Sequence, residues 1–288
     1  MSVRQATFYD KDRDRWYRDP SNPSKTYPGV TSILNSRGVP SLEKAKRNGI
    51  IEFVARNRDK LEGLPLSGVR SLLSDQATVL PEWSVGMPFG SATHQVIQNI
   101  IEDAPLDRNV EHVDGTDSYP VSNTFTEWVP RLWGEFVKQF KVEILECEQT
   151  VVSDTFGFGG SFDLIVSLET PEKGRHNAIV DTKTNKSGPH ASVAIQNKGY
   201  SKADAIMNLS TGERRSLPSI DASYVLWMQE FTTFDRPAWN LLPLSFDEHV
   251  WKIFYAHLLL FQFGKTEHEY MGDSLNGPDA FKRWIPRS

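Results

Sequence analysis

The sequence contains a single cysteine, Cys147, among its 288 residues. One cysteine excludes an intramolecular disulfide, and it excludes any zinc or iron–sulfur site that needs four thiolates. The sequence also lacks an apolar run of the ~20 residues that a membrane-spanning helix requires. Its N-terminal stretch has no apolar segment of the signal-peptide type, and its acids are atypical of a transit peptide. We therefore expect a reducing, cytoplasmic setting without membrane association.

An excess of positive charge is also missing, because 32 Lys and Arg stand against 37 Asp and Glu, a net charge of −5. The overall charge therefore does not indicate a nucleic-acid-binding protein, but the local balance matters more for a binding groove. Residues 182–203 contain four lysines and no acid, and residues 44–60 have a local charge of +4. Two solvated helix faces would explain these segments equally well. A chain of this length can form one elaborated domain or two small ones.

The most informative stretch runs from Phe158 to Lys183 and contains two short apolar segments, each of which carries an acid. Asp181 and Lys183 are two residues apart, so on a strand their side chains share one face. Asp163 on a neighbouring strand would complete a carboxylate pair beside the ammonium group. Hard divalent cations bind such oxygens, and a lysine beside them can orient a hydroxide or stabilise charge on a phosphate. The stretch predicts metal-dependent phosphodiester cleavage, although acids, lysines and Gly-Gly pairs also occur at ordinary strand ends and turns.

The remaining sequence predicts helices and strands around this stretch. His94 lies on an apolar helix face, where a histidine is usually a packed residue. Glu146 and Glu148 share a strand face, and Gln196 and Tyr200 share a helix face. The expected elements are an irregular polar arm over 1–26, helices over 42–58, 90–102, 125–140 (kinked or beginning at Pro130) and 191–207, strands over 144–152, 224–228 and 240–244, and a final helix with a Ser245–Glu248 capping box that ends at Gly264.

The order of these motifs resembles the PD-(D/E)XK nuclease superfamily, and within it the RecB-like exonuclease branch. The residues that carry the resemblance are Gly90–His94, Glu148–Asp163, Val180–Thr184 and Gln196–Tyr200. Pro28–Leu34 is similar to the segment that precedes the nuclease core in phage exonucleases and in mitochondrial genome maintenance exonuclease. Two features depart from the pattern: the four cysteines of some members are missing, and Gly29 stands where the phage pattern often has serine. The resemblance spans roughly residues 27–245.

The resemblance implies an α/β (α+β) fold with a restriction-endonuclease-like core, in which a central mixed β-sheet is flanked by helices and preceded by a helical N-terminal extension. The implied division is an N-terminal arm and helical region over 1–88, the nuclease core over 89–245, and a C-terminal helix and tail over 246–288. The implied activity is that of a DNA exonuclease acting at single-stranded ends in phage or bacterial recombination, replication or repair. An endonuclease of the same fold and a non-catalytic DNA-binding module are the alternatives.

The resemblance also implies a role for each site residue. His94, Asp163 and Asp181 would bind Mg²⁺ or Mn²⁺, and Glu148 would complete the acidic cluster unless Glu146 occupies that face instead. Lys183 would orient the attacking water and offset charge on the scissile phosphate. Gln196 and Tyr200 would position Lys183 or the DNA backbone, and Thr31, Ser32 and Lys186 are weaker candidates for phosphate contacts. No iron–sulfur cluster is expected. A recombinase, a single-strand-binding protein or a helicase would be a separate chain, because the sequence has no Walker motif.

Overall fold

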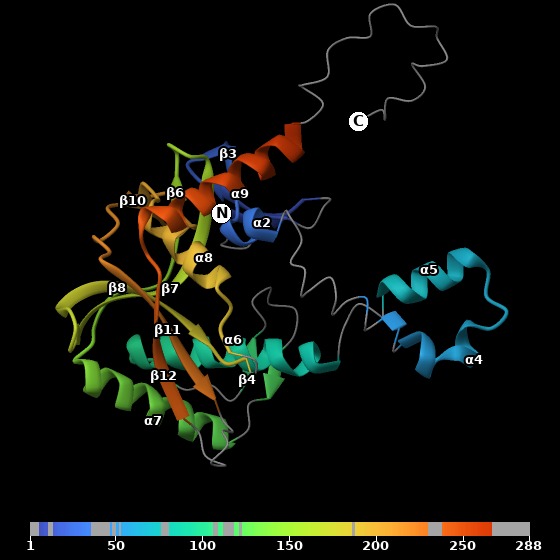
Figure 1. The fold of residues 1–288 in the computed structure, drawn as a ribbon, viewed down its shortest axis with the longest axis horizontal. Helices are drawn as coiled ribbons and strands as arrows, with labels where there is room; N and C mark the ends of the chain where they lie inside the picture. Colours follow the sequence, from blue (N-terminus) through green and yellow to red (C-terminus); the bar gives the residue numbers. More distant parts are fainter. Residues whose placement is uncertain are drawn as a thin grey trace, which may run out of the picture.

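A seven-stranded mixed sheet forms the centre of the protein (Figure 1), in the order β10-β9-β6-β7-β8-β11-β12. The computed structural model describes residues 6–10, 14–35, 47, 50–51, 53–75, 81–105, 109–111, 118–120, 123–185, 188–229 and 238–266. The strands are β6 (Glu143–Ser153), β7 (Phe158–Thr170), β8 (Gly174–Lys183), β9 (Ala205–Met207), β10 (Arg214–Arg215), β11 (Ala222–Gln229) and β12 (Ala238–Leu244). Only the β8–β11 pair is parallel among these neighbours. A parallel pair needs a long crossover, and the crossover here contains α8 (Ser192–Ser201).

Helices cover both faces of the sheet. On one face, α6 (Pro81–Ile101) and α7 (Asn123–Phe140) pack on the sheet through a core that includes Val96, Trp133 and Phe136. On the other face lie α2 (Val30–Asn35), α8 and α9 (Glu248–Thr266). The prediction of an α/β protein with a mixed central sheet flanked by helices is therefore confirmed.

The N-terminal segment forms a three-stranded antiparallel sheet, so the prediction of an irregular arm over residues 1–26 is wrong. Its strands are β1 (Thr7–Tyr9), β2 (Arg15–Asp19) and β3 (Asn22–Pro28). Tyr17 and Tyr27 are each 2% exposed and pack against Val152 and Met207 of the central sheet. The segment is ordered by these contacts with the core, which its own polar composition does not predict.

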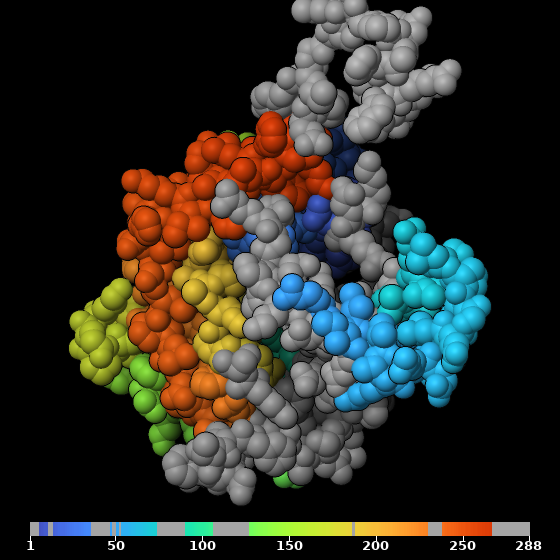
Figure 2. All heavy atoms as spheres, turned by 45° about the vertical axis from the view of Figure 1, so that its right-hand side comes forward, coloured from blue at the N-terminus to red at the C-terminus, as the bar shows by residue number. Residues whose placement is uncertain are grey.

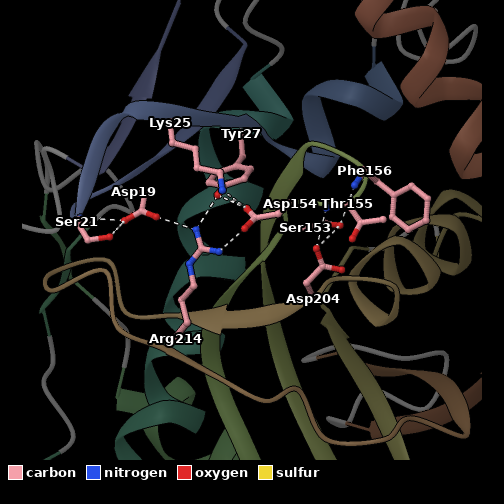
Figure 3. Close-up of polar contacts among 10 residues, drawn as sticks. All are labelled: Asp19, Ser21, Lys25, Tyr27, Ser153, Asp154, Thr155, Phe156, Asp204 and Arg214. Atoms are coloured by element: carbon pink, nitrogen blue, oxygen red, sulfur yellow. Dashed lines mark hydrogen bonds and ion pairs between the residues drawn. The ribbon is translucent and has the colours of Figure 1, made fainter.

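An ionic network also fastens the N-terminal sheet to the core (Figure 3). The Arg214 guanidinium donates to Asp154 at 2.6 Å, to Asp19 at 2.7 Å and to the Tyr27 hydroxyl at 2.8 Å. The Tyr27 hydroxyl donates to Asp154 Oδ1 at 2.5 Å, and Lys25 Nζ lies 2.8 Å from the same oxygen. Burial alone would raise the pKa of Asp154, but hydrogen bonds from Lys25, Tyr27 and Arg214 outweigh it and hold the pKa well below its ordinary value.

The remaining described elements lie around the sheet. Figure 1 shows α4 (Arg58–Leu61) and α5 (Leu66–Asp75) to the side of the sheet, and Figure 2 shows them as a lobe at the right-hand edge. Strands β4 (Asn109–Glu111) and β5 (Ser118–Pro120) pair antiparallel with each other. Within the predicted helix over residues 42–58, the described residues 47, 50–51 and 53–56 are helical, and α4 begins at Arg58. None of the described helices is both long enough and apolar enough to cross a membrane.

The bounds of helices α6 and α8 differ from the prediction. Helix α6 begins at Pro81 instead of Gly90 and continues through Pro88, although proline usually ends or kinks a helix. Helix α8 ends at Ser201, and the chain then forms β9 where the helix was expected to continue.

Helix α9 is capped by Asp247 and not by a Ser245–Glu248 capping box. The Asp247 Oδ1 atom accepts hydrogen bonds from the backbone N–H groups of His249 at 2.9 Å and Val250 at 3.1 Å. The helix also continues past Gly264 to Thr266.

Candidate functional site

The strand residues of the candidate site lie next to one another on β6, β7 and β8. The pairs Cys147↔Leu164 and Gln149↔Phe162 place Glu148 opposite Asp163. The last pair of the β7–β8 ladder, Leu164↔Val180, places Asp163 next to Asp181.

The two strands change their buried faces at the level of Glu148 and Asp163. Phe162 packs in the core under α8 and α9, whereas Leu164, two residues later, packs in the core under α6 and α7. In a regular strand both would lie on one face. Glu148 has a φ of 48°, a left-handed conformation that is uncommon outside glycine and that is found preferentially at functional sites. The local change of face brings the carboxylates to the margin of the core, where helix α6 reaches them.

His94 of α6 closes a three-residue group with Glu148 and Asp163. One ligand atom of each residue lies within 4.8 Å of the others. His94 Nδ1 lies 3.1 Å from Glu148 Oε1 and 3.6 Å from Asp163 Oδ2, and these side chains are 28%, 30% and 17% exposed. Burial alone would lower the pKa of His94, but the charge of Asp163 and the hydrogen bond and charge of Glu148 outweigh it and raise the pKa to about 9. The histidine on an apolar helix face is thus placed against two carboxylates.

A backbone contact that the sequence did not predict fixes Asp163. The N–H group of Thr182 donates to Asp163 Oδ2 at 2.7 Å. Because Thr182 is only 2% exposed, this hydrogen bond is shielded from water. The β8 strand therefore orients the acid of the neighbouring strand through its main chain, in addition to carrying Asp181 and Lys183.

Asp181 and Lys183 form a close ion pair, as expected for two residues on one face of β8. Lys183 Nζ lies 2.5 Å from Asp181 Oδ2, and Asp181 is 3% exposed. Burial and the charge of Asp163 raise the pKa of Asp181 to about 6, against the opposing effect of Lys183. Burial alone would lower the pKa of Lys183, but Asp181 and Asp163 raise it above its ordinary value. The lysine is therefore held charged beside the carboxylates.

The choice between the two glutamates of β6 is clear in the geometry. Both carboxylate oxygens of Glu146 accept hydrogen bonds from the Arg215 guanidinium. Glu148, in contrast, contacts His94. Glu148 is therefore the acid that faces the cluster, and its left-handed backbone separates its direction from that of Glu146.

Gln196 and Tyr200 contact each other on α8. Gln196 Nε2 donates to the Tyr200 hydroxyl at 2.8 Å, and Tyr200 is 3% exposed. Burial raises the pKa of Tyr200 well above its ordinary value, and the charges of Asp163 and Asp181 contribute in the same direction. The pair thus lies close to the cluster, while no hydrogen bond from either residue to Lys183 is found in the described part of the chain.

Of the three weaker candidates, the two that the structure describes, Thr31 and Ser32, do not join this cluster. Ser32 is buried at 7% exposure, and its hydroxyl accepts a hydrogen bond from the Arg15 N–H group at 2.7 Å. Thr31 is exposed. Lys186 lies outside the described residues.

The donor set of the three-residue group fits a divalent metal ion. Mn²⁺ accepts both an imidazole nitrogen and carboxylate oxygens as ligands. Mg²⁺ prefers oxygen ligands, which the two carboxylates supply. Asp181 is not among the three residues whose ligand atoms lie within 4.8 Å of one another, and its carboxylate contacts Lys183. The residues that could together bind a divalent ion are therefore His94, Glu148 and Asp163, and Asp181 lies next to them.

Comparison with known proteins leaves the site without a family assignment. No protein-family model matches the chain, and no curated protein matches it. Membership of a nuclease family thus stays a prediction from the residues quoted above.

Proposed function

We propose that the protein is a metal-dependent deoxyribonuclease with a restriction-endonuclease-like core, which hydrolyses phosphodiester bonds at single-stranded DNA ends. The observation that carries the proposal is the convergence of His94 from α6 with Glu148, Asp163 and the Asp181–Lys183 pair from three adjacent strands. A charged lysine beside several carboxylates suits a site that binds a cation and a phosphate together.

In this proposal His94, Glu148 and Asp163 hold a Mg²⁺ or Mn²⁺ ion, and Asp181 supports them. A bound ion of this kind supplies Lewis-acid stabilisation of the charge that develops on a phosphate. The Thr182 N–H group keeps Asp163 oriented toward the group. Lys183 holds the attacking water and places its positive charge beside the scissile phosphate. Gln196 and Tyr200 support the strand that carries Lys183 from the neighbouring helix.

The single cysteine cannot supply a four-cysteine iron–sulfur cluster. A cytoplasmic location, a role in phage or bacterial recombination, replication or repair, and separate recombinase, single-strand-binding or helicase partners stay predictions from the sequence.

Cleavage of end-labelled DNA tests the proposal. We expect the parent protein to degrade single strands with Mg²⁺ or Mn²⁺ and not with EDTA, and we expect Asp163→Asn and Lys183→Ala to lose the activity. Glu169→Gln is the matched control, because it removes one carboxylate charge from a surface ion pair with Lys141 on another part of the sheet. Activity that is equal in the parent and both site variants would refute the proposal.

Two further substrates separate the alternatives. Strands labelled at the 5′ or the 3′ end report the polarity of digestion. Covalently closed circular DNA stays intact with an exonuclease, and its cleavage would indicate an endonuclease with the same site. Binding of DNA without any cleavage under all metal conditions would indicate a DNA-binding module.

A further inference from the structure

Trp227 of β11 stands beside Lys183 in the sheet. The parallel ladder pairs Trp227 with Lys183 and Val225 with Asp181. Paired residues of neighbouring strands point to the same face, and the strands lie ~4.8 Å apart. Trp227 is therefore one strand away from the lysine of the candidate site and on the same face.

The neighbours of Trp227 confirm this direction. Leu226 and Met228, on either side of it, pack in the core under α6 and α7. Because side chains alternate along a strand, Trp227 points to the opposite face. Across the sheet, Glu148 on β6, Asp163 on β7, Lys183 on β8 and Trp227 on β11 thus occupy consecutive strands.

The indole ring is fixed and partly exposed. Its Nε1 donates to the Asn185 carbonyl at 2.9 Å, and a Cβ atom at Gly188 would lie 3.9 Å from the ring atoms Cζ2 and Cη2. The side chain of Val225, two residues earlier on the same face, is 0% exposed, whereas the side chain of Trp227 is partly exposed to solvent. The chain therefore holds a large flat ring in one orientation at the point where this face of the sheet begins to open to solvent.

We propose that Trp227 is a stacking platform for an unpaired nucleobase of the strand whose phosphate lies at the carboxylate cluster. The proposal rests on the function proposed above and deepens it by assigning the preference for single strands to a residue. Every nucleobase offers a flat face for stacking on an aromatic side chain. In a duplex the neighbouring base pairs cover these faces, so a platform next to the cluster selects a strand whose base is unpaired.

A purely structural role gives a different expectation, because Trp227 could serve only to anchor the loop after β8 through its N–H group. Trp227→Phe keeps an aromatic ring and removes the N–H donor, while Trp227→Leu removes the ring as well. Stacking predicts that the phenylalanine variant retains most of the affinity for single strands and that the leucine variant does not. Anchoring by the N–H group predicts that both variants lose it equally.

The experiment measures the affinity for fluorescently labelled single strands by anisotropy, in EDTA so that the strand is not cut. A series of strands places an abasic site at each successive position from the end. For the parent, we expect one position at which removal of the base weakens binding by roughly 5- to 150-fold, the value of one stacked base. This abasic effect should persist in Trp227→Phe and disappear in Trp227→Leu.

Trp239→Leu is the control, because Trp239 packs against Phe136 and Phe140 in the core on the opposite face. It should keep the abasic effect. The inference is overturned if the parent shows no position-dependent abasic effect, if Trp227→Leu retains the effect, or if Trp227→Phe loses as much affinity as Trp227→Leu. If Trp227→Leu does not fold, the abasic effect in the parent and its persistence in Trp227→Phe test the inference.

The two proposals fail in distinguishable ways. Loss of the proposed function appears as an absence of cleavage with Mg²⁺ and Mn²⁺ while the abasic effect and its dependence on Trp227 remain. If the stacking inference fails, the parent still shows metal-dependent cleavage, but its affinity for single strands does not change when a base is removed.

Discussion

Gly160 gives a direct test of how α8 packs against the strand that carries Asp163. A Cβ atom added at Gly160 would overlap Tyr200 Cε1 and would lie 3.2 Å from both Tyr200 Cδ1 and Val30 Cγ2. Tyr200 is 3% exposed, so its ring cannot move into solvent without opening the core between α2 and α8. Gly160→Ala therefore has to displace either helix α8 or strand β7.

Overpacking of this kind costs about 1–3 kcal/mol, which corresponds to a decrease in Tm of roughly 2–5 °C for a chain of 288 residues. Thermal unfolding followed by circular dichroism measures the decrease. Gly134→Ala is the matched control with the opposite sign, because no packed neighbour among the described residues lies within 4 Å of its added Cβ and the residue is inside helix α7. It should stabilise the protein by about 0.5–1 kcal/mol.

A double-mutant cycle locates the cause of the effect. In a Tyr200→Leu background, Gly160→Ala should cost clearly less than in the parent, because the overlapping ring atoms are gone. A Gly160→Ala variant that melts at or above the parent temperature would refute this packing, as would a cost that is unchanged by Tyr200→Leu.

Three other predictions follow from the same structure. Arg214→Met should lower Tm at pH 7, and the difference in Tm from the parent should shrink as the pH falls below about 4. The reason is that Asp154 has a lowered pKa and stabilises the fold only while it is ionised. A difference in Tm that does not depend on pH would contradict this. Glu148→Gln should weaken Mn²⁺ binding, measured by calorimetry, by more than the roughly 10- to 100-fold that is typical when a hydrogen-bond partner of a metal ligand is removed. Glu146→Gln should leave the affinity for Mn²⁺ nearly unchanged, because Glu146 pairs with Arg215. Equal effects would refute the distinction between these glutamates. Asp247→Ala should cost about 0.5–2 kcal/mol in denaturant unfolding, since it removes the N-cap of α9; no change would mean that another group caps the helix.

The strand-borne part of the site could be predicted from the sequence because it depends on local regularities. Asp181 and Lys183 share a face through the two-residue period of a strand, and the apolar runs around Asp163 and Asp181 indicate neighbouring buried strands. The position of His94 was open, because an apolar helix face is compatible with a packed histidine. Tertiary structure was needed to place α6 over Asp163.

Other features have no signal in the local sequence. The hydrogen bond from the Thr182 main chain to Asp163 involves a group that every residue other than proline possesses. The left-handed conformation of Glu148 breaks the alternation that made Glu146 and Glu148 equivalent candidates. The N-terminal sheet is polar and gains its order from Tyr17, from Tyr27 and from ion pairs with residues far along the chain. Contacts between distant segments, which periodicity does not describe, determine all three.

The proposed hydrolysis requires that His94, Glu148 and Asp163 together hold a divalent metal ion. An anomalous-difference map from a crystal of the protein soaked in Mn²⁺ tests it directly. We predict a peak within bonding distance of all three side chains, and no peak there in crystals of Asp163→Asn. A soaked parent crystal with no density at these residues, or with its ion bound elsewhere, would contradict this assignment of the metal site.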